Sequence, residues 1–332
     1  MDNTTKFKFM AQRKKIAIWG WWQGRNLGDL WILESLKRKF PGIIPITTEE
    51  EDFSKYDFMI IGGGGLLNGP RLRAPYNKPI PTQYGSFGLG GEFDIKDKEL
   101  LQDLINSSQF FGVRDKHNME TYSNNQVTKL EISGDCTFMF PLRRYNPNKL
   151  IKTIKLIWRD PFGLLKWDKS KHHQDDGLVL NEMFGNYLGP IPFNDNLKCL
   201  KFYTDTLKKY GNVIFDNYVS QQFDTKEMYD RFKGIDLVVT MRYHGVVAAV
   251  QLGIPCIGLD IYPKVRTIMT DVGLEKYCIK LNDINKINSL INDIKTNWEE
   301  IRTKMDTYTK KNYVLTNKFA NNAVGKILEL MK

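Results

Sequence analysis

The sequence predicts an α/β protein of two domains, each built around a doubly wound parallel sheet. The chain has 332 residues, more than one compact core usually holds. Short apolar runs alternate with amphipathic helical stretches in both halves, as in βα repeats. Residues 141–149 are rich in proline, asparagine and charge, which is typical of a linker. We therefore expect domains at residues 1–145 and 150–310 and a closing helix at 311–332.

The first domain opens with a short buried strand within residues 14–21. A loop leads from it into an amphipathic helix over residues 29–40, where apolar residues recur at helical spacing. Residues 42–47 and 56–67 supply two more strands. The second of these ends in four glycines, as expected where a parallel strand brings its C-terminal end to a ligand. Residues 98–115 then hold a helix that feeds another strand.

The second domain begins with the strand TIKLIWRD at residues 153–160. Residues 160–200 have no clear pattern and are interpreted as a long loop or lid. The alternation then returns. The elements expected after this passage are helices at 194–210, 225–233 and 242–252, strands at 212–216, 234–240 and 254–259, and two closing helices within 285–332.

The chain is basic, with 48 Lys and Arg against 38 Asp and Glu and a formal net charge of +10. Such a charge attracts polyanions, acidic lipid head groups or phosphorylated substrates, although a generic basic surface would also explain it. No cluster of five or more basic residues suggests a nucleic-acid arm, so nucleic acid is not expected as a partner.

The cysteines and the apolar runs indicate the compartment. The four cysteines lie far apart with no CxxC pair, which is typical of a reducing environment. The N-terminus lacks an apolar signal core, and no apolar run reaches the roughly 18 residues of a membrane span. We expect a cytoplasmic protein, with peripheral contact to the inner face of the membrane as its strongest membrane association.

Ligands of open α/β sheets bind beyond the C-terminal ends of the strands, so residues just after the predicted strands are candidates. Asn26 and Asp29 follow the first strand. Asp29 either caps the next helix or, with Asn26, projects toward a substrate to hydrogen-bond its hydroxyls. Gly64 and Gly65 end the glycine run, whose N–H groups could face an anion or a sugar. Because the run lacks the endings of a P-loop or dinucleotide fingerprint, ATP and NAD are not expected. Two further candidates of this kind are Arg114 and Tyr262.

Arg242 and His244, at the start of a predicted buried helix, are more specific candidates for a functional site. A guanidinium binds a carboxylate or phosphate through two parallel hydrogen bonds, as a fork, and an imidazole exchanges protons near neutral pH. A helix start also favours an anion. The strand at 254–259 delivers Tyr262 and Lys264 to the same edge of the sheet. His172 and His173 have no ligand-like neighbours at a helical interval, so no metal site is expected.

The assembled motifs resemble the polysaccharide pyruvyl transferase family. The matching stretches are NLGDLWI, IIGGGGLL, FGVRDKHNMETY with SGDCTFMFP, and TMRYHGVVAAVQLGIPCIGLDIYPK, of which the last is the most specific. Together they run from about residue 16 to residue 280. The sequence departs from the family at Tyr243, where members often carry leucine, and at Cys136, where they carry proline after aspartate. Residues 160–195 match no family motif.

The resemblance implies two Rossmann-like domains in a GT-B-like arrangement, with the active site in the interdomain cleft. It implies transfer of the pyruvyl unit of phosphoenolpyruvate to two hydroxyls of a sugar in a cell-surface polysaccharide or its lipid-linked precursor. Phosphoenolpyruvate would be a co-substrate, and no cofactor or metal ion is implied. Arg242, Lys264, Arg159 and Tyr243 would then bind the donor, His244 would act as general acid and base, and Asp29 would assist an acceptor hydroxyl.

The sequence is compatible with two other hypotheses. A glycosyltransferase of the same architecture would use a nucleotide sugar, but a Gly-rich turn is missing before Asp260, where such enzymes bind the ribose. A catalytically silent glycan-binding protein would not need Arg242, His244 and Lys264 together. Donor binding distinguishes the three readings.

Overall fold

The computed structural model describes residues 2–22, 26–47, 52–66, 83–91, 98–123, 129–158, 203–216, 220 and 223–332. The predicted loop or lid at 160–200, with its two histidines at 172 and 173, lies outside the described residues, and so does Arg159. The chain divides into two compact units. One comprises Met1–Leu142, Val219–Met228 and Thr307–Lys332, and the other comprises Arg143–Tyr218 and Tyr229–Asp306.

The first unit is built on a six-stranded parallel sheet in the order β2-β1-β3-β4-β5-β6. Its strands are β1 (Ile16–Trp19), β2 (Ile44–Ile46), β3 (Phe58–Gly64), β4 (Tyr84–Leu89), β5 (Phe111–Val113) and β6 (Leu130–Ile132). The helices described between its strands and before them are α1 (Asn3–Ala11), α2 (Leu27–Lys39), α4 (Lys98–Ser107) and α5 (Lys116–Tyr122), with a 3-10 turn at Cys136–Met139. Parallel strands with helical crossovers confirm the predicted doubly wound fold.

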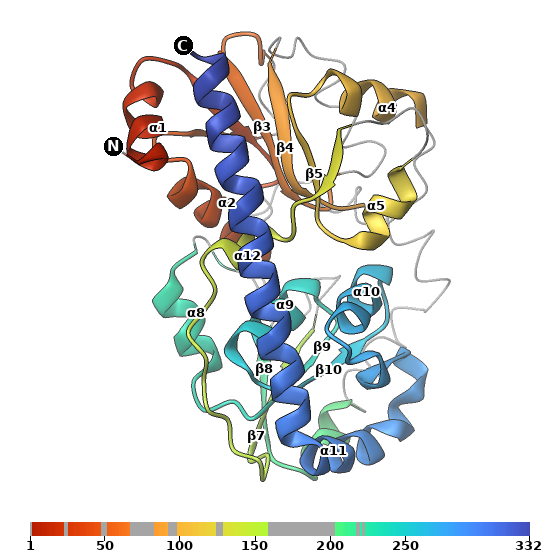
Figure 1. The fold of residues 1–332 in the computed structure, drawn as a ribbon. Coiled ribbons are helices and arrows are strands. Elements are labelled where there is room, and N and C mark those ends of the chain that lie inside the picture. The colour runs from red at the N-terminus through yellow and green to blue at the C-terminus, as the bar shows by residue number, and fades with distance from the viewer. Residues whose placement is uncertain are drawn as a thin grey trace, which may run out of the picture. The chain divides into compact units, whose positions relative to one another are not determined.

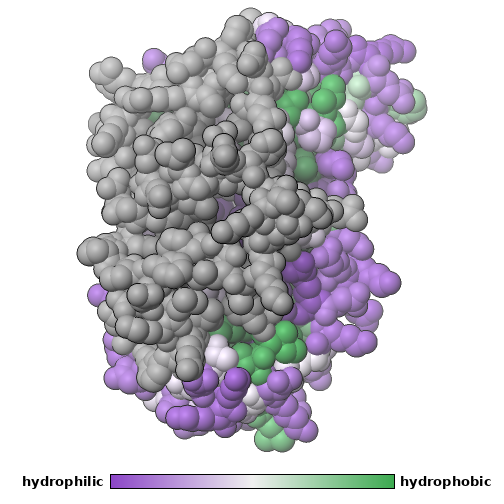
Figure 2. Space-filling model, turned by 180° about the vertical axis from the view of Figure 1, so that it is seen from behind, coloured by the Kyte–Doolittle hydropathy of each residue, from purple (hydrophilic) through white to green (hydrophobic). Residues whose placement is uncertain are grey.

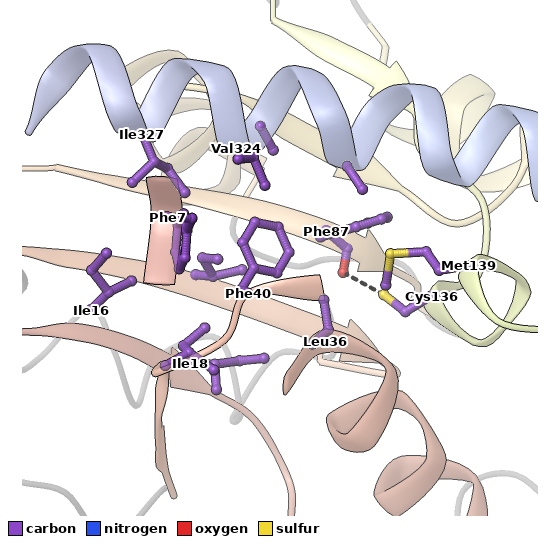
Figure 3. Packing of buried hydrophobic residues seen from close by; sticks show 14 of the residues in the cluster. Phe7, Ile16, Ile18, Leu36, Phe40, Phe87, Cys136, Met139, Val324 and Ile327 are labelled. Atoms are coloured by element: carbon purple, nitrogen blue, oxygen red, sulfur yellow. Dashed lines mark hydrogen bonds between the residues drawn. The ribbon is translucent and has the colours of Figure 1, made fainter. Parts of the chain in front are cut away.

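Two apolar clusters hold this unit together. The second cluster joins the sheet to α1, α2 and the end of the last helix, as Figure 3 shows for Phe7, Phe40, Val324 and Ile327. The rings of Phe7 and Phe40 meet edge to face, with centroids 5.4 Å apart. The helix α1 was not expected from the basic, polar start of the chain. Phe7, which is fully buried, fixes it to the core.

The second unit contains a five-stranded parallel sheet in the order β11-β10-β9-β7-β8. Its strands are β7 (Thr153–Ile157), β8 (Asn212–Asp216), β9 (Leu237–Thr240), β10 (Cys256–Leu259) and β11 (Cys278–Ile279). The helices that follow residue 220 are α8 (Thr225–Phe232), α9 (Tyr243–Leu252), α10 (Pro263–Asp271), α11 (Ile287–Thr296) and α12 (Trp298–Leu330). Figure 1 shows α9 and α10 beside the strands β9 and β10. The strands expected at 153–160, 212–216, 234–240 and 254–259 are all present.

The closing helix is longer than predicted. We expected it to begin at residue 311, but α12 starts at Trp298 and continues without interruption to Leu330. Its sequence contains no proline, and its single glycine is Gly325. Nothing local therefore ends the helix between 298 and 311. Its first part belongs to the second unit and its last part to the first.

Among the described residues, no helix is both long and apolar enough to cross a bilayer. Figure 2 shows the side of the molecule opposite to the view of Figure 1. Most described residues visible there are hydrophilic, and apolar residues gather in a few small areas. Within the same part of the chain, no group of three or more His, Cys, Asp or Glu is arranged to hold a metal ion.

Candidate active site

Arg242 and His244 lie directly beyond the C-terminal end of β9, as predicted. Arg242 is the N-cap residue of α9, and its extended backbone is fixed by Thr240. The Thr240 hydroxyl accepts a hydrogen bond from the Arg242 N–H at 3.0 Å and donates one to its carbonyl at 3.3 Å. His244 is buried, with 7% of its surface exposed. The Tyr243 ring meets the imidazole edge to face, with centroids 5.0 Å apart and planes at 89°. Thr240 and Tyr243 therefore hold the two polar residues in place.

Tyr262 and Lys264 lie beyond the neighbouring strand. The pairing of Gly258 with Thr240 aligns the ends of β10 and β9, and the helices α10 and α9 that follow pack on each other. Tyr262 is the N-cap residue of α10, and the Lys264 Nζ lies 5.2 Å from the centre of its ring. This cation–π contact orients the ammonium group. The fold thus brings the starts of two helices, with four of the predicted residues, to one edge of one sheet.

The electrostatics of this edge favour an anion. Neither Arg242 nor Tyr262 caps its helix with a side-chain hydrogen bond. In the first unit, by contrast, Asp2, Asn26 and Asp115 cap their helices with side-chain oxygens. Helix N-termini carry partial positive charge, so a cation beside one is unfavourable by itself. Placing Arg242 and Lys264 at two such termini makes the edge suited to a ligand with more than one negative charge.

Gly245 allows α9 to approach the sheet closely enough to form this site. A Cβ at this position would stand 2.3 Å from the Thr240 Oγ1 and 3.2 Å from the Ile157 Cδ1. The helix therefore rests on β9 and β7 through a residue without a side chain, next to His244.

Gly245→Ala is expected to lower the free energy of unfolding by about 1–3 kcal/mol, because the methyl group overpacks a buried contact. Gly325→Ala in α12 is the matched control, since a Cβ there would meet no atom within 4 Å. Removing a helical glycine in open space should instead stabilise by about 1 kcal/mol. Urea unfolding of both variants checks the pair, and a loss of equal size in both would contradict the packing argument.

In the first unit, the N-cap of α2 is Asn26, not Asp29. The Asn26 Oδ1 accepts the Gly28 N–H at 3.1 Å, and α2 starts at Leu27. The capping role weighed for Asp29 was therefore wrong: the helix begins earlier, and Asp29 falls in its first turn. Its carboxylate lies instead beside the glycine run, where a Cβ on Gly64 would stand 3.2 Å from Asp29 Oδ1.

The glycine run packs against α2. A Cβ on Gly62 would meet the Ile18 and Leu36 side chains, and one on Gly63 would stand 2.4 Å from the Ile32 Cγ2. Gly63 and Gly64 also have positive φ angles of 38° and 79°, a region that L residues with side chains rarely adopt. Close packing and backbone conformation thus account for glycine at 62–64. Gly65, which is half-buried, is the member of the run that lies just beyond the end of β3.

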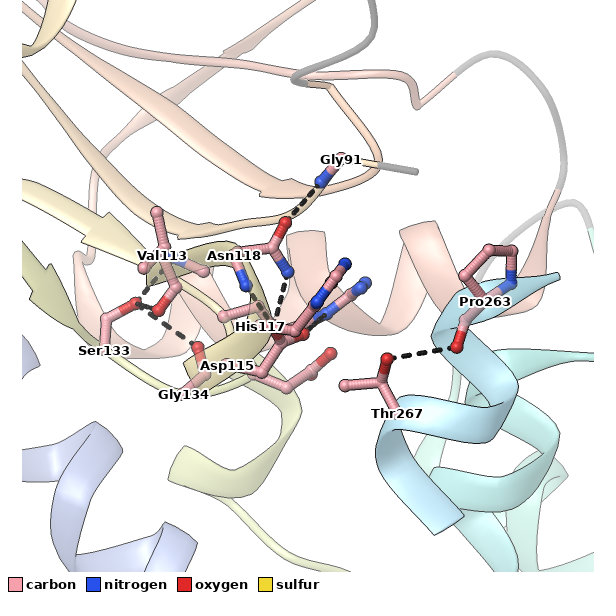
Figure 4. A network of polar contacts seen from close by, with 12 residues as sticks. Gly91, Val113, Asp115, His117, Asn118, Ser133, Gly134, Pro263 and Thr267 are labelled. Atoms are coloured by element: carbon pink, nitrogen blue, oxygen red, sulfur yellow. Dashed lines mark hydrogen bonds and ion pairs between the residues drawn. The ribbon is translucent and has the colours of Figure 1, made fainter. Parts of the chain in front are cut away.

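Arg114 is buried in a polar network, where it supports the backbone at the ends of β4 and β5. Its Nε donates to the Asp115 Oδ2 at 3.1 Å. Asp115 caps α5 by accepting the Asn118 N–H and also accepts from the Asn118 amide, whose oxygen accepts the Gly91 N–H at 2.8 Å. Figure 4 shows the contacts among Asp115, Asn118 and Gly91. A Cβ on Gly90 would stand 2.8 Å from the Arg114 guanidinium carbon, so the arginine packs directly against the backbone at Gly90, just after β4.

The second unit also contains a buried ionic cluster that was not predicted from the sequence. The Lys155 Nζ lies 3.0 Å from the Asp216 Oδ2, and the Arg231 guanidinium lies 3.0 Å from the other oxygen of that carboxylate. Burial lowers the pKa of Lys155, and Asp216 opposes that shift. A lysine inside the apolar strand TIKLI was a visible signal, but its partner follows more than fifty residues later.

Comparisons with known proteins show which family the chain belongs to. A family model described as polysaccharide pyruvyl transferase matches residues 13–261. No curated protein sequence matches significantly. Anabaena HepE, solved in complex with UDP-glucose, is 12% identical, with a TM-score of 0.49 over 95% of this chain and 99% of that chain. An uncharacterised protein of Klebsiella pneumoniae is 15% identical, with a TM-score of 0.43 over 84% and 100%. A putative UDP-N-acetylglucosamine 2-epimerase of Listeria monocytogenes is 9% identical, with a TM-score of 0.48 over 92% and 94%.

Proposed function

The chain belongs to the polysaccharide pyruvyl transferase family, and from this premise we propose that it transfers pyruvate from phosphoenolpyruvate to a sugar as a cyclic ketal. The observation that carries the proposal is the edge formed by β9 and β10. There Arg242 and Lys264 stand at the starts of two helices whose N-cap side chains make no capping hydrogen bond, next to a buried histidine.

Phosphoenolpyruvate fits the charges of that edge. It carries a carboxylate and a phosphate on a three-carbon frame, so it needs two cations at close range. Arg242 grips one anionic group in a fork and Lys264 neutralises the other, while the two helix termini add N–H donors. Arg159, two residues beyond the end of β7, is proposed as a third cation, because β7 is the other neighbour of β9. The Tyr243 ring lines the donor site beside the imidazole.

The chemistry requires a group that both gives and takes a proton. A proton reaches the methylene carbon of the donor, which becomes a methyl group, and one sugar hydroxyl attacks the adjacent carbon. The bond from this carbon to the phosphate oxygen breaks, phosphate leaves, and a second hydroxyl closes the ketal with loss of its proton. His244 is proposed to deliver the first proton and to accept protons from the hydroxyls. No step uses a metal ion or a further cofactor.

The acceptor is proposed to be a saccharide, either in a cell-surface polysaccharide or on its lipid-linked precursor. Asn26, Asp29, Gly65 and Tyr262 are the candidates for hydrogen bonds to its hydroxyls. Asp29, beside Gly64, is proposed to orient or deprotonate one of them. Arg114 supports this set indirectly, since its contacts fix the turn at Gly90 and Gly91.

Phosphoenolpyruvate is expected to raise the melting temperature of the protein, because a ligand that binds only the folded state stabilises it. Arg242→Lys should weaken that binding by about tenfold or more, since a point charge cannot reproduce the guanidinium fork. Thermal unfolding with increasing phosphoenolpyruvate measures both effects. Arg143→Lys, at an exposed position, is the control and should bind normally.

A panel of nucleotide sugars belongs in the same experiment. Stabilisation by a nucleotide sugar without any by phosphoenolpyruvate would replace pyruvyl transfer with glycosyl transfer. Normal phosphoenolpyruvate binding by Arg242→Lys would remove this arginine from the donor site while leaving the transferase in place.

A further inference from the structure

The first unit has a basic face that the proposed reaction does not use. We name it the N-terminal face and define it by α1 with the segment up to Lys15, the last two turns of α2, the end of α12 with Lys332, and Asp57, whose carboxylate accepts the Lys15 N–H. Packing joins these elements: Phe7 meets Phe40, Ala11 lies under Gly42, and Lys39 donates to Asn321 at 2.7 Å. Figure 1 shows α1, α2 and the C-terminal part of α12 next to one another, with the two chain ends nearby.

Cations outnumber acids on this face. Its basic side chains are Lys6, Lys8, Arg13, Lys14, Lys15, Lys37, Arg38, Lys39, Lys326 and Lys332, and its acidic ones are Asp2, Glu34, Asp57 and Glu329. Three of the acids pair locally with a lysine at 3.6–3.9 Å, namely Glu34 with Lys37, Asp57 with Lys14, and Glu329 with Lys326. These are exposed, weak pairs. The face keeps an excess of positive charge toward solvent.

An exposed aromatic residue lies among these cations. Phe9 is 53% exposed, although Phe7, two residues earlier, is fully buried. Two residues turn an α-helix by about 200°, so Phe9 points away from the core that holds Phe7. Lys6, three residues before it, shares its outer side of the helix, and Lys8 lies next to it in the chain. Exposure of a large apolar ring to water is unfavourable, so Phe9 would be stabilised by contact with an apolar phase.

We propose that the N-terminal face docks on an anionic lipid surface, with Phe9 entering the interface and the surrounding lysines and arginines binding head-group phosphates. Basic residues near an anionic leaflet add to one another, and an aromatic side chain supplies the apolar contact that charge alone lacks. The sequence has no cluster of five or more basic residues of the kind that forms a nucleic-acid arm, which favours lipid over nucleic acid. This inference goes beyond the proposed function and does not depend on it.

The test is flotation of the full-length protein with vesicles of phosphatidylglycerol and phosphatidylcholine in equal parts, and with phosphatidylcholine alone. The protein should float with the first and stay behind with the second. Lys6→Gln combined with Lys8→Gln should reduce binding to anionic vesicles by about tenfold or more. Phe9→Ser should also reduce binding to anionic vesicles. The fold reduction caused by Phe9→Ser should persist at raised salt concentration, because salt does not screen an apolar contact.

Matched controls come from the second unit. Lys149→Gln with Lys233→Gln removes the same charge from exposed positions, and Leu150→Ser removes a side chain that is 68% exposed. Both controls should float like the original protein, and circular dichroism should show all variants folded. Equal losses in the controls, or normal binding by Phe9→Ser, would overturn the lipid assignment. Tighter binding to single- or double-stranded nucleic acid, lost in the lysine variant, would assign the face to that polyanion instead.

Discussion

His244→Ala is expected to lower kcat for pyruvyl transfer by roughly 10² or more, because general acid-base groups typically contribute this much. The imidazole is buried at the start of α9, held edge-on by Tyr243. Alanine leaves nothing there that can exchange a proton. Phosphoenolpyruvate binding should change little, since Arg242 and Lys264 remain. The measurement is phosphate release with a saccharide acceptor, together with a donor titration by thermal unfolding.

His117→Ala is the control for this variant, because His117 is an exposed histidine on α5. It should turn over at the original rate. His244→Ala must also keep its melting temperature within a few degrees of the original protein for the comparison to hold. A folded His244→Ala protein that binds donor and releases phosphate at near the original rate would remove His244 from the mechanism.

The alternation of apolar runs was enough to predict the strands that carry the site. β9 and β10 are short apolar runs followed by polar residues, and in a parallel sheet those residues must share an edge. β4 was missed because its sequence, YGSFGL, looks like a turn. Its glycines are explained by neighbours distant in the chain: Gly85 lies against Phe110, and Gly88 lies against Cys136. No local pattern reveals such contacts.

The cap of α2 shows the limit of local reasoning in another way. Asn26 and Asp29 are both good capping residues within four positions. Only the actual start of the helix at Leu27 assigns the cap to Asn26 and leaves Asp29 beside Gly64. The roles of Thr240 and Tyr243 are likewise hidden in the sequence, since both depend on the geometry of the turn between β9 and α9.

Asp216→Ala is expected to destabilise the protein by about 3–5 kcal/mol, because it leaves the Lys155 ammonium buried without its carboxylate. The Lys155 side chain is only 4% exposed, whereas Arg231 is 22% exposed and can turn toward water. Urea unfolding measures the loss. Glu120→Ala is the control: its pair with Lys116 is exposed, so the change should stay below about 0.5 kcal/mol.

A second substitution separates charge from packing. Lys155→Met added to Asp216→Ala should restore most of the lost stability, since an apolar side chain in place of a buried ion is often neutral.

The pH dependence of stability tests the role of the Lys155 charge independently. Burial already lowers the pKa of Lys155 from 10.5, and removing Asp216 lowers it further. Between that lowered pKa and 10.5 the unfolded chain binds more protons than the folded one, so stability rises with pH. The deficit of Asp216→Ala should therefore shrink as the pH is raised toward 10. A deficit that is constant with pH and is not relieved by Lys155→Met would mean that Asp216 acts through its contact with Arg231 or through packing, and not through the charge of Lys155.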